Sequence, residues 1–284
     1  MSLKQRILYP FARRFFAGLR LDDAIRRAKA LNARGMGATL DFMGEDVRDA
    51  KEVEAAYAEY VRAITAVSEG GLNASVAIKL THLGLDAGRD AAEDAAVRLA
   101  DIAGGKGVFL WVDMEGSAHT EDTIRVYRRL LDGHKGGVGL AIQACLKRTP
   151  EDVKALAAEG AVIRLVKGAY KETPDIALQE MDEIRAAFTG LMEYLFNNAD
   201  GFAIGTHDRA LIDKARGLAA GYGGKFEFQM LMGMRDDLKQ TLAAEGRTVI
   251  EYVPYGTDWY GYGIRRLNEK RRNAIYFAQG LMGK

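Results

Sequence analysis

The chain has 284 residues, of which 48% are hydrophobic, and its formal net charge is +1. That length is typical of a single α/β barrel, and the hydrophobic fraction supports a sizeable core. A nearly neutral chain gives no indication of a nucleic-acid partner, so a small ligand is the better expectation. The single cysteine, Cys145, excludes an internal disulfide framework and a cysteine-cluster zinc site, which suits a reducing cytosol.

Residues 1–36 read as an N-terminal helical segment, rich in arginine, that packs on the rest of the protein. Large apolar side chains recur there at helical spacing, namely Phe11, Phe15, Phe16 and Leu19. Packing against the body of the protein is the preferred interpretation of these side chains. A basic amphipathic helix can also lie on an anionic membrane, so peripheral contact with the inner face of the membrane stays open. No apolar run approaches the roughly 18 residues of a spanning helix. We therefore expect a cytoplasmic protein.

From residue 37 onward, short apolar runs alternate with longer segments of helical periodicity. The eight runs are residues 38–43, 75–80, 108–113, 138–143, 162–166, 202–206, 226–229 and 248–253. Apolar strands of this kind are typical of a parallel sheet covered on both faces, and eight strand–helix units predict a (β/α)8 barrel over residues 37–284. A doubly wound open sheet is the alternative, but no Gly-x-Gly-x-x-Gly follows the first run.

Polar side chains gather where these runs end, which in a barrel is the end that carries the active site. They include Glu45, Lys79, Asp113, Gln143, Arg164, Lys167, Thr206 and His207. Because the basic groups slightly outnumber the acidic ones, we expect several cations to lack a carboxylate partner unless an anionic ligand is bound. The glycines at 168 and 205 permit close approach of the backbone to a phosphate. The four histidines are scattered without paired spacing, so we expect no metal site.

The stretch from Tyr252 to Glu269 reads as a strand, a turn and a short helix. Side chains three and four positions apart share a helix face, which here carries Tyr262, Arg265, Arg266 and Glu269. Two adjacent guanidiniums can bind one small carboxylate, and a glutamate can hold one of them in place. The same pattern is more often a solvated helix face with an ion pair, so the stretch alone does not establish a site.

Three of these segments together resemble the proline dehydrogenase family of flavoenzymes. They are Arg164-Leu-Val-Lys-Gly-Ala-Tyr170, Phe226-Glu-Phe-Gln-Met-Leu231 and the stretch from Tyr252 to Glu269, and the resemblance extends over Asp41 to Glu269. It implies a (β/α)8 barrel that holds FAD above the strand ends, with the last helix over the barrel mouth. It also implies oxidation of L-proline to Δ1-pyrroline-5-carboxylate by hydride transfer from ring C5 to flavin N5, with electrons passing to a membrane quinone. No aldehyde dehydrogenase domain follows the barrel in this sequence, so we expect the monofunctional form.

The resemblance further implies a role for individual residues. The proline carboxylate would be held by Lys79, Arg265 and Arg266. The ring would be enclosed by Tyr170, Leu231, Tyr252 and Tyr262. The basic groups would be supported by Asp113 and Glu269, and Glu45 could close over the substrate by pairing with Arg265. FAD would be contacted by Gln143, Arg164, Lys167, Gly168, Ala169, Thr206 and His207, with Arg164 near the N5 edge. Cys145 departs from the family, in which an aromatic residue is common at that position.

Two other functions remain as alternatives. A Schiff-base aldolase on the same barrel would use Lys167 or Lys79 as the nucleophile and would need no flavin. A barrel that senses an amino acid would keep the arginine pair without turnover.

Overall fold

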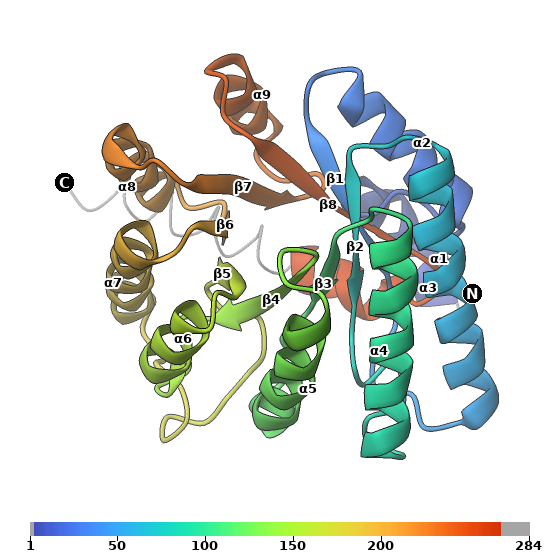
Figure 1. Ribbon diagram of the computed structural model, residues 1–284. Coiled ribbons are helices and arrows are strands. Elements are labelled where there is room, and N and C mark those ends of the chain that lie inside the picture. Colours follow the sequence, from blue (N-terminus) through green and yellow to red (C-terminus); the bar gives the residue numbers. More distant parts are fainter. Residues whose placement is uncertain (1–2, 268–284) are drawn as a thin grey trace.

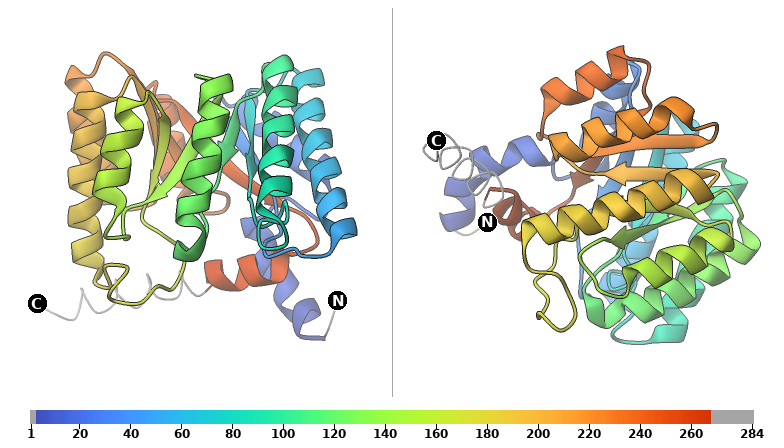
Figure 2. Two further views of the ribbon diagram at one scale, coloured as in Figure 1. Left: turned by 60° about the horizontal axis from the view of Figure 1, so that its bottom comes forward. Right: turned by 90° about the vertical axis from the view of Figure 1, so that its left-hand side faces the viewer.

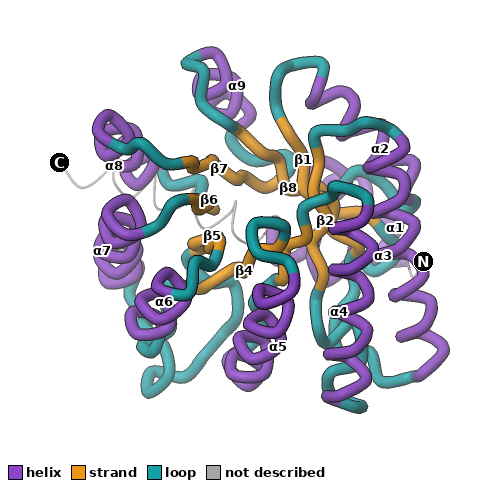
Figure 3. Tube along the Cα trace, in the orientation of Figure 1, coloured by secondary structure: helices purple, strands orange, loops and turns teal. Residues whose placement is uncertain are grey.

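The computed structural model describes residues 3–267, and its strands form one closed parallel barrel in which β1 pairs with β8. The strands are β1 (Gly37–Phe42), β2 (Ala74–Ile78), β3 (Leu110–Val112), β4 (Val138–Gln143), β5 (Val162–Val166), β6 (Gly201–Gly205), β7 (Lys225–Leu231) and β8 (Val249–Tyr255). They lie at the centre of the molecule with the helices around them (Figures 1 and 3). The predicted (β/α)8 barrel is confirmed, and the open-sheet alternative is wrong because the sheet has no edge strand.

A helix follows each strand, and those that follow β1 to β7 cover the outside of the barrel. Over residues 3–244 the helices are α1 (Leu3–Ala12), α2 (Leu21–Asn32), α3 (Ala50–Glu69), α4 (Arg89–Gly105), α5 (Thr120–Gly133), α6 (Thr149–Ala158), α7 (Met181–Asn198), α8 (Arg209–Leu218) and α9 (Asp236–Ala244). Short 3-10 turns occupy Arg13–Phe15, Ser117–His119 and Ala219–Gly221. After β8 the described chain ends in a helix over residues 259–267.

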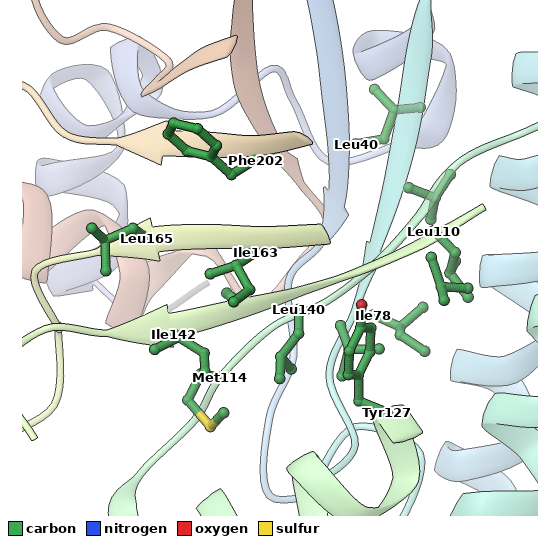
Figure 4. Close-up of a cluster of buried hydrophobic side chains, with 14 of the residues drawn as sticks. Leu40, Ile78, Leu110, Met114, Tyr127, Leu140, Ile142, Ile163, Leu165 and Phe202 are labelled. Carbon is green, nitrogen blue, oxygen red and sulfur yellow. The ribbon is translucent and has the colours of Figure 1, made fainter. Parts of the chain in front are cut away.

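Alternation along each strand explains how the barrel wall is built. Successive side chains of a strand point to opposite faces, and the outward set packs against the helices as the main hydrophobic core. Figure 4 shows part of this layer, including Leu40, Ile78, Leu140 and Ile163 from four strands together with Tyr127 of α5. The inward set then faces the barrel interior, so every second residue of a strand is a candidate for the site.

Four strands differ in length from their predicted runs: β2 and β3 are shorter, and β7 and β8 are longer. The run at 108–113 pairs as a strand only over Leu110–Val112, because the Val108 N–H donates to the Ala103 carbonyl at 2.9 Å and closes the end of α4. β8 runs on to Tyr255, where it still pairs with Phe42 of β1. The longer β8 therefore brings the chain to the C-terminal end of the barrel before the last described helix begins.

The N-terminal segment contacts that last described helix. Phe16 is fully buried and stacks on Trp259, with ring centroids 5.7 Å apart. Phe15 is also buried, whereas Phe11 is 64% exposed and Leu19 is 37% exposed. Figure 2 shows α1 and the helix of residues 259–267 at the same end of the barrel. The apolar side chains of the segment thus divide between packing and exposure, and the proposed boundary at residue 36 stays a prediction. Among residues 3–267, no helix is long and apolar enough to cross a membrane.

Candidate active site

A buried ionic cluster lies inside the C-terminal end of the barrel. Asp113 follows β3 and accepts hydrogen bonds from Arg164 of β5 and from Tyr252 Oη of β8, the latter at 2.5 Å. Lys79 follows β2, contacts Asp41 of β1 and lies 3.6 Å from Asp113 Oδ2. Inward-facing positions of five strands or strand ends therefore meet at one point, as the barrel predicts.

The cluster holds Lys79 protonated. Burial alone would lower the pKa of Lys79, but the carboxylates of Asp41 and Asp113, together with Tyr252, outweigh burial and raise that pKa well above its ordinary value. Burial and then the Asp113 carboxylate raise the pKa of Tyr252, so the phenol keeps its proton and donates to Asp113. The cluster therefore presents fixed hydrogen-bond donors toward the barrel mouth at neutral pH.

Two aromatic rings contact the Arg164 guanidinium, which belongs to a residue only 3% exposed. Its Cζ lies 4.7 Å from the Trp111 ring centroid and 5.4 Å from that of Tyr252. Its Nη1 donates to Gln229 Oε1 at 3.0 Å, while Nη2 donates to Asp113. A guanidinium held by two hydrogen bonds and two rings has little freedom to turn, so it is a rigid donor.

Above this cluster, a second group connects the loop after β1 with the last described helix. Glu45 accepts from Arg265 Nη1 at 3.0 Å and from Tyr170 Oη at 3.2 Å. Arg266 lies on the next helical position, with Cζ 5.5 Å from the Tyr262 ring centroid. The structure thus brings the predicted substrate residues of this region together, except Glu269, which lies outside the described residues.

The residues predicted to contact a cofactor lie at the ends of β4, β5 and β6. Lys167 Nζ donates to Asp208 Oδ2 at 2.6 Å, and Arg185 Nε reaches the same oxygen at 2.7 Å. The hydroxyl of Thr206 accepts from the Asp208 N–H at 3.2 Å. Asp208 also accepts from the Ala210 N–H and so caps α8. This helix N-terminus is therefore partly satisfied by its own carboxylate, whose charge two cations balance.

His207 is neutral at physiological pH. Burial, followed by the charge of Arg266, lowers the pKa of His207 to about 3. Its Nε2 accepts from the Leu231 N–H at 2.9 Å, which places the proton of the neutral ring on Nδ1. His207 is thus a fixed neutral donor that also positions the end of β7.

The loop after β5 passes close to β4. Gly168 has φ +117°, which favours glycine, and a Cβ there would collide with Cys145 Sγ. Gln143 Oε1 accepts from the Ala169 N–H at 3.3 Å, while its Nε2 donates to the Glu115 carbonyl at 3.0 Å. The small Cys145 side chain therefore lies directly beneath the glycine, where a larger side chain would push the loop outward.

The expectation that several cations lack a carboxylate partner is wrong for four of them. Lys79 pairs with Asp41 and Asp113, Arg164 with Asp113, Lys167 with Asp208, and Arg265 with Glu45. The sequence predicts no site role for Asp41, Gln229 or Asp208. Strand alternation could have found the first two, because Asp41 and Gln229 each lie two positions from an inward-facing residue of the same strand.

One group of potential metal ligands converges at the loop after β1, one residue beyond Glu45. Ligand atoms of Asp46, Asp86 and His119 lie within 4.8 Å of one another. Both acids are exposed, and Asp86 pairs with Arg48 at 3.5 Å. The group fits a solvated charge cluster and adds nothing to the site.

Known proteins are similar to this chain in sequence and in fold. The family model for proline dehydrogenase matches residues 24–279. Proline dehydrogenase 1 of Bacillus subtilis (strain 168) is 35% identical over 276 residues, which cover 96% of this chain and 91% of that protein. Proline dehydrogenase of Deinococcus radiodurans is 33% identical over 289 residues, covering 99% of this chain and 93% of that one.

A solved structure agrees at the level of the fold. The proline utilization A protein of Bdellovibrio bacteriovorus superposes with a TM-score of 0.86 at 24% identity, over 93% of this chain and 33% of that longer chain. The sequence match over nearly the whole chain and the barrel with charged strand ends lead to one conclusion. The chain belongs to the proline dehydrogenase family.

Proposed function

We propose that this protein oxidises L-proline to Δ1-pyrroline-5-carboxylate with FAD as its cofactor and a membrane quinone as the final electron acceptor. The observation that carries the proposal is the arrangement at the barrel mouth. There Arg265, Glu45 and Tyr170 form one hydrogen-bonded group above the buried cluster of Lys79, Asp113 and Arg164, in a chain of this family.

The substrate side suits a small carboxylate. Arg265 already binds a carboxylate, that of Glu45, through Nη1. A guanidinium presents five N–H donors, so the same side chain can hold a substrate carboxylate while Glu45 fixes its position. Arg266 adds a second guanidinium one residue away, with the aromatic face of Tyr262 beside it. We infer that Arg265 and Arg266 anchor proline and that Tyr170, Tyr252, Tyr262 and Leu231 enclose its ring.

The cofactor side suits a phosphate-bearing, hydrogen-bonding group. Its donors are two cations, an amide, a hydroxyl and a neutral imidazole, contributed by Arg164, Lys167, Gln143, Thr206 and His207. Gly168 carries no side chain at the point where the loop after β5 passes closest to Cys145. When bound, FAD supplies the acceptor for the hydride that leaves C5 of the ring. The protein binds and orients both partners, and the rigid Arg164 would face the reacting edge.

The aldolase alternative fits less well. A Schiff-base lysine needs a lowered pKa, so that a neutral amine is available as nucleophile. Asp41 and Asp113 instead raise the pKa of Lys79. Lys167 Nζ donates to Asp208 Oδ2 at 2.6 Å, so this amine is already engaged by a carboxylate.

Membrane contact is proposed for the N-terminal segment. Phe11 is 64% exposed, and Arg13 and Arg14 beside it are exposed as well. An apolar side chain next to two cations suits an anionic bilayer surface. Since this segment packs on the helix of residues 259–267, it would bring the barrel mouth close to a quinone in the bilayer.

The deciding experiment is to record the visible spectrum of the purified protein and to add L-proline without oxygen. We expect a flavin spectrum that bleaches with L-proline and not with D-proline. A colourless protein that does not bind added FAD would overturn the proposal. Covalent trapping of a carbonyl substrate by borohydride would support the aldolase instead.

The carboxylate anchor has its own test in Arg266→Ala. We expect the half-saturating concentration of proline to rise roughly 30- to 100-fold, because a charge-assisted hydrogen-bonded contact to the substrate is lost. Arg209→Ala, an exposed arginine at the start of α8 that pairs with Asp213, is the matched control. Unchanged proline binding in the Arg266 variant would rule out this anchor.

A further inference from the structure

A hydrogen-bonded chain runs from Arg164 toward the opposite end of the barrel. Gln229 accepts from Arg164 Nη1 at 3.0 Å, and its own Nε2 donates to Glu227 Oε1 at 2.5 Å. Glu227 and Gln229 are two positions apart on β7, so both side chains point into the barrel. The chain thus connects the most buried cation of the site to an acid that no role described so far includes.

Glu227 cannot reach a substrate at the barrel mouth. It lines a cavity of about 640 Å³ at the N-terminal end of the barrel, together with Phe109, Trp111, Phe226 and Ile250. Trp111 belongs to both regions, because its ring also contacts the Arg164 guanidinium at 4.7 Å. The hydrogen-bonded path from Glu227 to the site therefore runs through Gln229 and Arg164.

The chemistry of the neighbours fixes the Gln229 amide in one orientation. The Arg164 guanidinium only donates, so it requires Oε1 on its side. A carboxyl oxygen of Glu227 accepts, so it requires Nε2 on the other side. Burial raises the pKa of Glu227, but Oε1 can accept from Nε2 in either protonation state. Without Glu227, Gln229 Nε2 loses its acceptor, and Arg164 alone holds the amide in this orientation.

We propose that Glu227 and Gln229 are positioning residues. They fix the Arg164 guanidinium from the N-terminal side of the barrel, as Asp113 does from the mouth. The inference rests on the proposed function, since it assigns Arg164 to the reacting edge of the flavin. Asp113 holds Nη2 and Gln229 holds Nη1, so the plane of the guanidinium is determined by both. Without the hydrogen bond to Gln229, the Arg164 guanidinium keeps one hydrogen bond, to Asp113, and its contacts with the rings of Trp111 and Tyr252. Ring contacts of this kind let the guanidinium shift in its own plane.

The first test needs neither substrate nor turnover. The chain has two tryptophans, and Trp259→Phe leaves only Trp111. The fluorescence emission of Trp111 then reports on the Arg164 guanidinium that lies against its ring. In this background, at equal flavin occupancy, we expect Glu227→Ala and Gln229→Met to change the Trp111 emission. Glu227→Gln keeps an oxygen that accepts from Nε2 and should restore the parent emission.

The second test measures flavin reduction by proline. We expect Glu227→Ala to lower the rate at saturating proline roughly five- to ten-fold, with proline affinity changed less, because one buried hydrogen-bond partner is lost on the cofactor side. Glu227→Ala should have no additional effect in the Gln229→Met background, since both substitutions interrupt the same hydrogen-bonded path to Arg164. Lys225→Gln is the control. It changes one charge on the same face of β7, but Lys225 takes no part in the hydrogen-bonded path from Glu227 to Arg164.

The outcomes separate the inference from the proposed function. Parent-like Trp111 emission in Glu227→Ala would overturn the inference, and so would a full additional effect of Glu227→Ala in the Gln229→Met background. Equal effects of Glu227→Gln and Glu227→Ala would also overturn it, because charge rather than the hydrogen bond would then matter. A parent protein that is not reduced by proline would instead contradict the proposed function, and the emission test would still decide whether Glu227 positions Arg164.

Discussion

Two neighbouring residues of β8, Glu251 and Tyr252, enter two buried polar clusters on opposite faces of the barrel wall. Tyr252 points inward and donates to Asp113 in the cluster with Lys79 and Arg164. Glu251 points outward, is fully buried, and accepts from Arg27 of α2 and Lys239 of α9. Both clusters pair buried or half-buried cations with buried carboxylates.

The difference lies in what each cluster faces. The outer one is covered by α2 and α9, and its groups contact only other parts of the fold. The inner one lies at the open end of the barrel, where a ligand can reach its donors. We therefore expect damage to the outer cluster to appear as lost stability and damage to the inner cluster to appear mainly as lost activity.

The largest expected effect is that of Glu251→Ala on stability. It removes the acceptor of Arg27 Nε and Nη2, at 2.6 and 2.9 Å, and leaves Lys239, 2% exposed, with Asp236 as its remaining carboxylate. Breaking a buried pair by removing one partner costs about 3–5 kcal/mol, and we expect that loss in urea unfolding. Flavin reduction per folded molecule should be unchanged. A stable but inactive variant would break the distinction between the clusters.

Asp113→Asn should give the opposite pattern. The amide keeps the shape but loses the charge that holds Arg164 and Lys79. We expect kcat/KM for proline to fall roughly 100- to 1000-fold, because misplaced donors at the reacting centre cost that much. The unfolding midpoint should shift less than in Glu251→Ala. Activity within three-fold of the parent would show that the inner cluster is structural as well.

Acid should destabilise the fold through a buried histidine beside the inner cluster. Burial, and then the charge of Lys79, lower the pKa of His82 to about 4. Since an unfolded histidine titrates near pH 6.5, the unfolded state binds the additional proton between about pH 6.5 and 4, and stability falls as the pH falls through that window. The difference of about 2.5 between these two pKa values corresponds to roughly 3–4 kcal/mol of unfolding free energy at neutral pH. His82→Gln should flatten this part of the profile of unfolding free energy against pH.

The smallest expected effect comes from the partly exposed pair at the mouth. Arg265 and Glu45 are 3.0 Å apart, with side chains 44% and 27% exposed. Such pairs contribute below about 1 kcal/mol, so Glu45→Gln should raise the half-saturating concentration of proline only several-fold. The difference from the parent should shrink at high salt, because exposed charges are screened. An effect as large as that of Asp113→Asn would place Glu45 with the inner cluster.

The sequence alone predicted the architecture well for a physical reason. Eight apolar runs alternating with helical periodicity leave few folds other than a closed parallel barrel, and strand ends of such a barrel form the site. Strand-end position alone therefore predicts that Lys79, Asp113 and Arg164 lie at one end of the barrel. The ends of β3, β7 and β8 differ from the predicted runs, because an apolar run carries no signal for where pairing with its neighbour stops.

Partners across the barrel could only come from the tertiary structure. Local alternation says that Asp41, Glu227 and Gln229 point inward, but not which side chain each one meets, because that depends on strand register and barrel closure. From the numbers of basic and acidic residues at the strand ends, the sequence predicts that several cations lack a carboxylate partner. Closure brought Asp41 to Lys79 and Gln229 to Arg164, since strands far apart along the chain project into one small interior.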